Sequence, residues 1–315
     1  MPTTTTPQRP RAHASSAIAL ALAAVLTVGI ARVRPPQATM QQNTGASPAR
    51  FWAEKAQVEA RLDVVLAGDS RVFRGLAPEE MRATLPGSRI GNLGFSGACL
   101  CGDYLPYLEH ALGDGSGEKI IVLGVTPHAL TSHAARDNGF LAERRRTMRE
   151  RLESEYLGPL EDALRPVDAA ELLRGGSAEA RTNALYFQDF HEGGWVASRL
   201  WPESPDGAVP EYERVLREGK VEPTLEEALL AQVARWRARK VRVVAFRPPT
   251  SKEMRAVEAR LAGYDEAAFA ARLRDAGAEY WEIAPDAYHT YDGSHLTEAS
   301  ARELSRDVAA RLARR

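Results

Sequence analysis

Residues 62–70, with the sequence LDVVLAGDS, carry the clearest indication of the fold. The run from Leu62 to Ala67 is apolar apart from Asp63, and Gly68 ends it, which is typical of a short buried strand. Apolar runs of the same kind recur along the chain as KIIVLGV and VRVVAF, at residues 119–125 and 241–246. These runs predict strands of a sheet that is buried on both faces.

Stretches with the composition and apolar spacing of helices separate and follow these runs. We expect helices at residues 49–61, 77–85, 102–113, 225–239, 251–262 and 266–276 and in the C-terminal stretch from Leu296. Two shorter strands are expected, one within residues 88–97 and one from Tyr280 to Ile283. Strands that alternate with helices favour an α/β fold, a three-layer sandwich with a parallel sheet between two layers of helices.

One long segment, residues 131–224, does not follow this alternation. It is highly charged at residues 144–151 (RRRTMRER) and aromatic at residues 184–195 (ALYFQDFHEGGW). We interpret it as an insertion that forms a cap on a loop at one edge of the sheet. A separate small domain is the alternative. The chain shows no internal repeat.

The N-terminal region has three parts ahead of the domain at residues 49–315. Residues 1–16 are polar and rich in Pro and Thr, so we expect disorder. Residues 17–31 are largely apolar, but a helix of that length spans about 22 Å against a hydrocarbon core of about 30 Å. The segment is interpreted as a membrane anchor with the domain outside the cytoplasm, or as a signal peptide whose cleavage would leave the protein secreted. Arginines directly after it favour the anchor, and residues 32–48 are interpreted as a linker.

The composition is that of an ordinary soluble globular protein. The 315 residues are 44% apolar and 26% charged, which suits one large domain or two small ones. With 41 basic and 42 acidic residues, the formal net charge is -1. Because so balanced a chain has no overall field that attracts nucleic acid, we expect no nucleic-acid partner.

The cysteines and histidines give no metal site. Cys99 and Cys101 are the only cysteines, too few for a disulfide framework or a Cys-rich zinc site. A bridge between such near neighbours would be strained, so we interpret both as small packing residues. His128 and His133 are poorly spaced for two ligands on one helix face, and no carboxylate pattern completes a site. We therefore expect neither a metal nor a cofactor.

Polar residues follow each predicted strand. In an open parallel sheet, ligands bind beyond the carboxyl ends of the strands, so these residues should gather at one edge. They are Gly68-Asp69-Ser70, Asn92 to Gly97, Gly124 to His128, Arg247 to Ser251 and, before the last helix, Asp292-Gly293-Ser294-His295. The candidate site is therefore this edge of the sheet.

The residue types at this edge fit nucleophilic catalysis. A serine hydroxyl needs an adjacent base, and His295 can serve Ser70 in that role. Asp292 can hold the imidazole in the required tautomer, as a carboxylate does in a Ser-His-Asp triad. A serine at a turn from strand to helix has backbone amides beside it, and Gly97 would let a second N–H approach the same oxygen. The sequence predicts a triad with an oxyanion hole at Ser70 and Gly97.

These motifs resemble the SGNH/GDSL hydrolase superfamily. The resemblance rests on GDS (68–70), FSG (95–97) and DGSH (292–295), whose order along the chain matches that of the family. It covers residues 62–130 and 240–315 and implies an SGNH/flavodoxin-like fold. By this resemblance the family's nucleophile falls on Ser70, its oxyanion glycine on Gly97, and its Asp and His on Asp292 and His295.

The chain departs from the family at its third motif. The family carries an Asn within a GxND pattern, whereas this sequence has Gly-Val-Thr-Pro at residues 124–127, with Thr126 at the Asn position. The Thr126 hydroxyl could donate one hydrogen bond to the oxyanion, from a shorter side chain than that of asparagine. Losing one such donor typically slows the reaction by about 100- to 1000-fold.

The resemblance implies an extracytoplasmic serine esterase or O-acyltransferase. Its substrate would be an acyl ester of a carbohydrate or of a cell-envelope polymer, or a small ester. In layout the chain is similar to a membrane-anchored branch of the superfamily, that of the alginate O-acetylation and D-alanyl transfer proteins. A catalytically inactive binding module of the same fold, which presents a polysaccharide to a partner, is the alternative. Arg71 and Arg247 are candidates to bind an anionic group of the substrate. A solvated helix face or surface turn is the alternative for both.

Overall fold

A computed structural model of the chain describes residues 16–26, 41–42, 48–58, 61–113, 117–157 and 185–314. The chain divides into two compact units, one of residues 1–37 with 152–183 and a larger one of residues 38–151 with 184–315. The expected disordered N-terminus and linker lie almost entirely outside the described residues.

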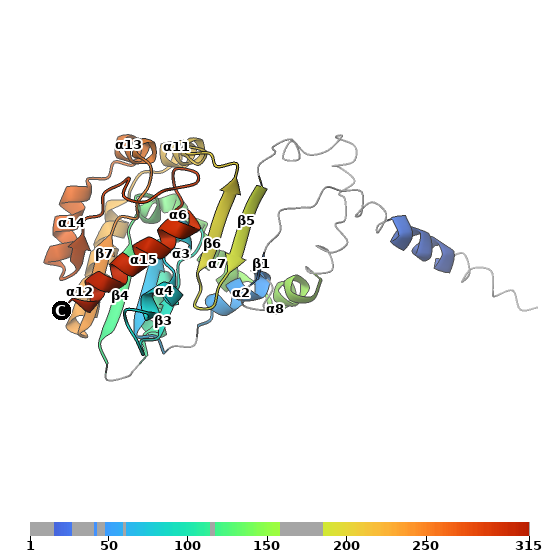
Figure 1. Ribbon diagram of the computed structural model, residues 1–315, viewed down its shortest axis with the longest axis horizontal. Coiled ribbons are helices and arrows are strands. Elements are labelled where there is room, and N and C mark those ends of the chain that lie inside the picture. The colour runs from blue at the N-terminus through green and yellow to red at the C-terminus, as the bar shows by residue number, and fades with distance from the viewer. Residues whose placement is uncertain are drawn as a thin grey trace, which may run out of the picture. The chain divides into compact units, whose positions relative to one another are not determined.

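The larger unit is built on a sheet of five parallel strands (Figure 1). The strands are β2 (Val64–Gly68), β3 (Ile90–Asn92), β4 (Lys119–Gly124), β7 (Val241–Phe246) and β8 (Glu279–Trp281). Their order across the sheet is β3-β2-β4-β7-β8. Counted along the chain, this is the flavodoxin-like order 2-1-3-4-5, which reverses between β2 and β4. The α/β fold with a parallel sheet is therefore confirmed.

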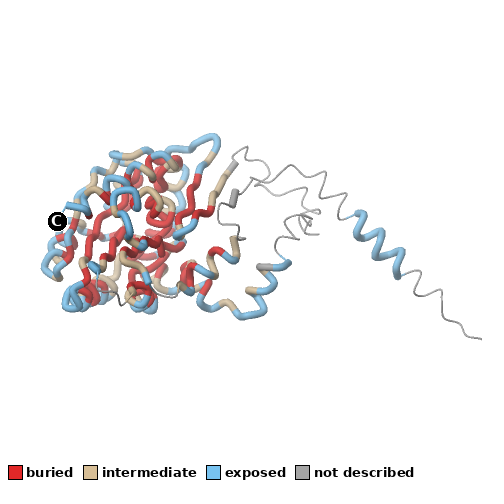
Figure 2. The backbone as a smooth tube through the Cα atoms, turned by 60° about the horizontal axis from the view of Figure 1, so that its bottom comes forward, coloured by how far each residue is buried: buried red, intermediate tan, exposed pale blue. Residues whose placement is uncertain are grey.

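Helices pack on both faces of this sheet. They are α2 (Pro48–Lys55), α3 (Ser70–Gly75), α4 (Pro78–Arg82), α5 (Tyr104–Ala111), α12 (Pro223–Ala238), α13 (Lys252–Leu261), α14 (Glu266–Asp275) and α15 (Glu298–Ala313). Val65 and Ile121 share a core with α5, α12 and α14. Their neighbours Val64 and Ile120 point to the other face, where they share a core with α3, α4 and α15. Figure 2 shows buried residues in the interior of the larger unit, and the cores on the two faces of the sheet are consistent with a three-layer sandwich.

The segment at 131–224 contains several short elements of its own. Its helices are α6 (Ser132–Arg136), α7 (Gly139–Arg145), α8 (Met148–Leu152) and α11 (Val209–Glu218), preceded by a 3-10 turn η1 (His128–Leu130), and the turn η2 (Glu153–Leu157) follows α8. Strands β5 (Leu185–Phe190) and β6 (Val196–Trp201) form an antiparallel hairpin, and β1 (Gln41–Gln42) pairs with β5 in parallel. This second sheet was not expected from the sequence.

Aromatic side chains hold the β5–β6 hairpin on the main core. Trp195, at the turn of the hairpin, is fully buried, and its Nε1–H donates a hydrogen bond to the carbonyl of Arg74 at 2.8 Å. Phe190 packs edge-on against Phe51, with ring centroids 4.9 Å apart. The aromatic part of the insertion therefore belongs to the core that carries α3.

The apolar N-terminal segment is described over residues 16–26, which form a helix with exposed side chains. The rest of the segment expected to be an anchor, residues 27–31, lies outside the described residues. Among the described residues, no helix combines the length and apolar character needed to cross a membrane.

Cys99 and Cys101 form a disulfide bond, so the expectation of two unpaired packing cysteines is wrong. Their Cα atoms lie 5.2 Å apart, a separation that disulfides commonly have. The turn between Gly97 and Asp103 brings the two residues to this distance. The chain segment directly after Gly97 is thus cross-linked.

Gly68 allows the end of β2 to lie close to β4. Its φ is +151°, and a Cβ there would lie 2.5 Å from Val72 Cγ2 and 2.6 Å from the Gly124 carbonyl oxygen. A side chain at position 68 would therefore clash with Val72 of helix α3 and with Gly124 of strand β4.

We expect Gly68→Ala to lower the free energy of unfolding by at least about 3 kcal/mol, because backbone strain adds to overpacking. Gly87→Ala is the matched control, since Gly87 also has a positive φ, +80°, but no atom lies within 4 Å of its added Cβ. The control should cost about 1–2 kcal/mol. Urea unfolding of both variants measures this difference, and equal losses would contradict the packing argument.

Candidate active site

Ser70 lies at the sharp turn from strand β2 to helix α3. Asp69 is the N-cap of this helix, and its Oδ1 accepts a hydrogen bond from the Arg71 N–H at 3.0 Å. Its carbonyl accepts another from the Val72 N–H. Because the first turn of a helix leaves amides unpaired, an aspartate at this position stabilises the turn. Ser70 is thereby fixed at the carboxyl end of β2, next to β4, where the strand order reverses.

The loop before α15 positions the other two predicted residues. Asp292 Oδ1 accepts hydrogen bonds from the Ser294 N–H at 2.9 Å and from the His295 N–H at 2.7 Å. The Tyr291 N–H donates to the His295 carbonyl at 3.0 Å. The loop is therefore held by its own hydrogen bonds, which fix the position of the imidazole.

The structure brings Ser70, His295 and Asp292 together. Ser70 Oγ lies 2.9 Å from His295 Nε2, although the two residues are 225 positions apart in the sequence. His295 Nδ1 lies 2.7 Å from Asp292 Oδ2. With the proton on Nδ1 donated to Asp292, Nε2 can accept the proton of the serine hydroxyl. The distances and the order of contacts are those that a Ser-His-Asp triad requires.

His295 is in its neutral form at neutral pH. Burial, together with the nearby guanidinium groups of Arg74 and Arg71, lowers the pKa of His295 to about 4 against the opposing effect of Asp292. Burial by itself would raise the pKa of Asp292, but the hydrogen bonds from His295 and from the loop amides hold it below its usual value. An ionised carboxylate therefore faces a neutral imidazole, the state in which the imidazole can accept a proton.

A pocket of about 410 Å³ opens at Ser70. Ser70 and Gly97 line it, together with residues of the insertion that include Asn138 and Tyr212. The insertion thus contributes a wall of the pocket. A larger cavity of about 640 Å³ lies beside β3 and has none of the triad residues in its lining, so we place the site at the smaller pocket.

Sequence reasoning missed several residues of the pocket. The sequence places His128 after a predicted strand, at the expected edge of the site, but assigns it no role there. In the structure it lies against Gly97: a Cβ added to Gly97 would be 3.4 Å from His128 Cε1. Tyr212 lies on α11 within the insertion, where no local pattern marks it. Asn138 is the N-cap of α7, and its Oδ1 accepts from the Leu141 N–H at 3.0 Å.

Ser70 and Gly97, the residues expected to form the oxyanion hole, both line the pocket. Ser70 is the first residue of α3, so its N–H has no partner within the helix. Gly97 has a φ of +58° and lines the same pocket.

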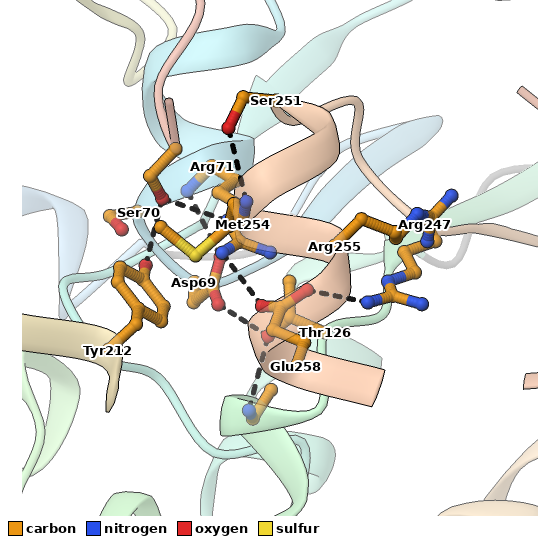
Figure 3. A network of polar contacts seen from close by, with 12 residues as sticks. Asp69, Ser70, Arg71, Thr126, Tyr212, Arg247, Ser251, Met254, Arg255 and Glu258 are labelled. Atoms are coloured by element: carbon orange, nitrogen blue, oxygen red, sulfur yellow. Dashed lines mark hydrogen bonds and ion pairs between the residues drawn. The ribbon is translucent and has the colours of Figure 1, made fainter. Parts of the chain in front are cut away.

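Thr126, by contrast, does not line the pocket at Ser70. It is fully buried, and its hydroxyl donates to Asp69 Oδ2 at 2.5 Å while its Oγ1 accepts from the Ala129 N–H at 3.2 Å (Figure 3). The expected oxyanion role of Thr126 is therefore corrected to one of holding the Asp69 carboxylate.

Arg71 and Arg247 are also corrected. Both side chains are buried and form ion pairs with Glu258, Arg71 Nη2 at 2.8 Å and Arg247 Nη2 at 2.6 Å (Figure 3). Neither residue lines the pocket at Ser70. Because these guanidinium groups are already neutralised inside the protein, they are not available to bind an anionic substrate group.

No cluster of His, Cys, Asp or Glu within the described ranges could hold a metal ion. His128 and His133 lie in the wall of the pocket with ring centroids 6.0 Å apart. The site is organised around hydrogen bonds of the triad.

We predict that His295 remains neutral until the pH falls to about 4, because burial and the neighbouring arginines oppose its protonation. The folded protein therefore loses stability as the pH falls from about 6.5, the usual histidine pKa, towards 4, since the unfolded chain then binds the proton more readily. An NMR titration of the imidazole, assigned with the His295→Gln variant, measures this pKa. A midpoint near 6.5 would contradict the prediction.

Thr126→Val should lower the free energy of unfolding by about 1–3 kcal/mol, because the buried Asp69 Oδ2 loses a hydrogen bond. Thr126→Ser retains the hydroxyl and is the control. Urea unfolding measures the loss, and reaction of Ser70 with an esterase probe should change by less than about 10-fold. A loss of about 100-fold or more in Thr126→Val alone would show that the hydroxyl does act as an oxyanion donor.

Comparisons with known proteins give no further assignment. The chain matches no protein-family model, no curated protein and no solved structure. The resemblance to SGNH/GDSL hydrolases therefore rests on the motifs of the sequence.

Proposed function

We propose that this protein is a serine esterase or O-acyltransferase of the SGNH type, with a three-layer α/β sandwich as its fold. The observation that carries the proposal is the chain of hydrogen bonds from Ser70 Oγ to His295 Nε2 and from His295 Nδ1 to Asp292 Oδ2, at 2.9 and 2.7 Å. It lies at the carboxyl edge of a parallel sheet, where such folds bind ligands, and Ser70 opens into a pocket.

The reaction proceeds in two steps. Ser70 Oγ attacks the ester carbonyl carbon while His295 Nε2 takes the hydroxyl proton, and Asp292 stabilises the imidazolium that forms. The N–H groups of Ser70 and Gly97 bind the oxygen that becomes negative. The C–O bond of the ester then breaks, His295 returns its proton to the leaving alcohol, and the acyl group remains on Ser70.

The second step releases the acyl group. A hydroxyl of water or of an acceptor sugar gives its proton to His295 and attacks the acyl carbonyl carbon. The bond between that carbon and Ser70 Oγ then breaks, and His295 returns the proton to Oγ, which restores the serine hydroxyl. Water gives hydrolysis, and a sugar hydroxyl gives transfer. The insertion lines the pocket at Ser70, and exclusion of water by it would favour transfer.

The substrate class follows from the family resemblance. An acyl ester of a carbohydrate or of a cell-envelope polymer suits a pocket of about 410 Å³ that takes a short acyl group and part of its acceptor. A position outside the cytoplasm, with the N-terminal segment as anchor or cleaved leader, is part of the proposal. The Cys99–Cys101 disulfide supports it, because disulfides persist in oxidising compartments.

A catalytically inactive binding module is the second candidate. One observation favours it: the Thr126 hydroxyl is bound to Asp69, so the oxyanion would have two amide donors and no side-chain donor at the third motif. The loss of one donor slows such reactions by about 100- to 1000-fold. The complete triad favours the enzyme.

A fluorophosphonate probe distinguishes the two candidates. We expect covalent labelling of the wild-type protein at Ser70 and none in Ser70→Ala, because only an activated serine attacks the phosphorus. Hydrolysis of p-nitrophenyl acetate should fall by at least about 1000-fold in the same variant. Mass spectrometry of the labelled protein locates the adduct.

Ser96→Ala is the matched control, since Ser96 lines the same pocket without contacting His295. It should be labelled within about 3-fold of the wild-type rate. A folded wild-type protein that is not labelled, or a Ser70→Ala variant that still is, would favour the binding module.

A further inference from the structure

Arg71 connects the two segments that carry the triad. It directly follows Ser70, and its Nε donates a hydrogen bond to Ser294 Oγ at 3.0 Å. Ser294 lies between Asp292 and His295 in the sequence, and its own N–H is bound to Asp292. The side chain of Arg71 therefore joins the turn at the nucleophile to the loop that holds the base.

Glu258, on helix α13, fixes Arg71 from the other side. It is fully buried, and its Oε1 lies 2.8 Å from Arg71 Nη2 (Figure 3). Its Oε2 pairs with Arg247, which also binds Glu266 at 2.6 Å. Arg255 also pairs with Glu266, at 2.9 Å, so three arginines and two glutamates form one network of ion pairs next to the active site.

Tyr212 encloses the guanidinium of Arg71 from the insertion. The guanidinium carbon lies 4.8 Å from the centre of the Tyr212 ring, and the Ser294 hydroxyl donates to the Tyr212 hydroxyl oxygen at 3.1 Å. Since Tyr212 also lines the pocket at Ser70, the Arg71 side chain lies between the pocket wall and the loop of His295. Three contacts determine its orientation, from α11, from α13 and from the loop before α15.

Stability does not account for this arrangement. Replacing a buried ion pair by apolar side chains of similar size is often neutral or stabilising, because each charge is costly to remove from water. What apolar side chains could not reproduce is the hydrogen bond to Ser294, which has a defined direction. Such a bond is suited to hold the loop of His295 at the distance that proton transfer needs.

We propose that Arg71, oriented by Glu258, is a positioning residue that holds the Asp292–His295 loop against Ser70. The inference rests on the proposed function, and it assigns Arg71 a role in proton transfer in place of substrate binding. Arg71 acts through Ser294 and does not contact the substrate.

Arg71 also acts on His295 through its charge. The charged groups and tyrosine that face the imidazole are Asp292 and Tyr291 from its own loop and Arg74 and Arg71 from α3. Both arginines lower the pKa of His295. Removing Arg71 should therefore raise this pKa, which a purely structural role elsewhere in the protein would leave unchanged.

The test uses two variants of the full-length protein. Arg71→Met/Glu258→Met removes one charge of each sign and leaves Arg247 and Arg255 both paired with Glu266, so we expect it to fold. Arg71→Lys keeps the positive charge but loses the Nε donor to Ser294. If the double variant does not fold, this variant tests whether Arg71 positions the loop of His295. The rate of fluorophosphonate labelling at Ser70 and the NMR pKa of His295 are measured for each.

We expect labelling to slow by about 10- to 100-fold in both variants, because a displacement of about 1 Å in such a site can cost 100-fold. With p-nitrophenyl acetate, kcat should fall while KM stays within about 2-fold. The pKa of His295 should rise in the double variant and remain low in Arg71→Lys. Arg302→Met is the control: Arg302 pairs with Glu79, Glu80 and Glu298, away from the loop, and its loss should leave labelling within about 2-fold.

Wild-type labelling rates in folded Arg71 variants would overturn the proposal. If the wild-type protein is not labelled at all, the proposed function fails and the pKa of His295 decides the inference on its own. A raised pKa in the double variant, unchanged in Arg302→Met, then supports the action of Arg71 on His295. An unchanged pKa in both would reject it.

Discussion

The hydrogen bond between Ser70 and His295 depends on the packing of nearly the whole larger unit. Ser70 begins α3 and His295 precedes α15, and these helices lie on the same face of the sheet, where Val72 and Leu304 share one core. The Ala77 N–H donates to Ser305 Oγ at 2.7 Å, so α15 is also tied to the turn after α3. A hydrogen bond tolerates errors of only a few tenths of an ångström, so the position of α15 against α3 must be fixed by this core.

The sheet and the triad could be predicted because their signals are local. Strand β7 spans the same residues, 241–246, as the apolar run in the sequence, and β4 and β2 end within one residue of theirs. Once parallel strands are predicted, their carboxyl ends must lie at one edge, whatever the exact packing. The topology of the sheet and the residue types that follow each element were therefore enough to predict that Ser70 and His295 lie close together.

The buried arginines, the β5–β6 hairpin and the role of Thr126 could not be predicted, because each depends on contacts with residues far away in the sequence. Arg71 and Arg247 look like solvated side chains until Glu258, on a helix with many charged residues, is placed between them. The position of the β5–β6 hairpin depends on Trp195 and Phe190, which pack against residues far away in the sequence. The role of Thr126 could not be assigned from the sequence, because the sequence does not show that the Asp69 carboxylate accepts its hydroxyl hydrogen. Burial of charge and the choice of hydrogen-bond partner are three-dimensional properties that no local pattern contains.

The low pKa of His295 has a consequence for the proposed reaction. A base with a pKa of about 4 accepts a serine proton poorly in the free protein, so the basicity needed for attack must arise with the substrate. The oxygen that becomes negative supplies it: opposite charges about 4 Å apart attract by about 4 kcal/mol at an effective dielectric of 20, equivalent to about three pKa units. The attraction of Asp292, at 2.7 Å, is already contained in the pKa of about 4. In this site burial and the arginines keep His295 unprotonated over a wide pH range, while the developing oxyanion makes it a base only when an ester is being attacked.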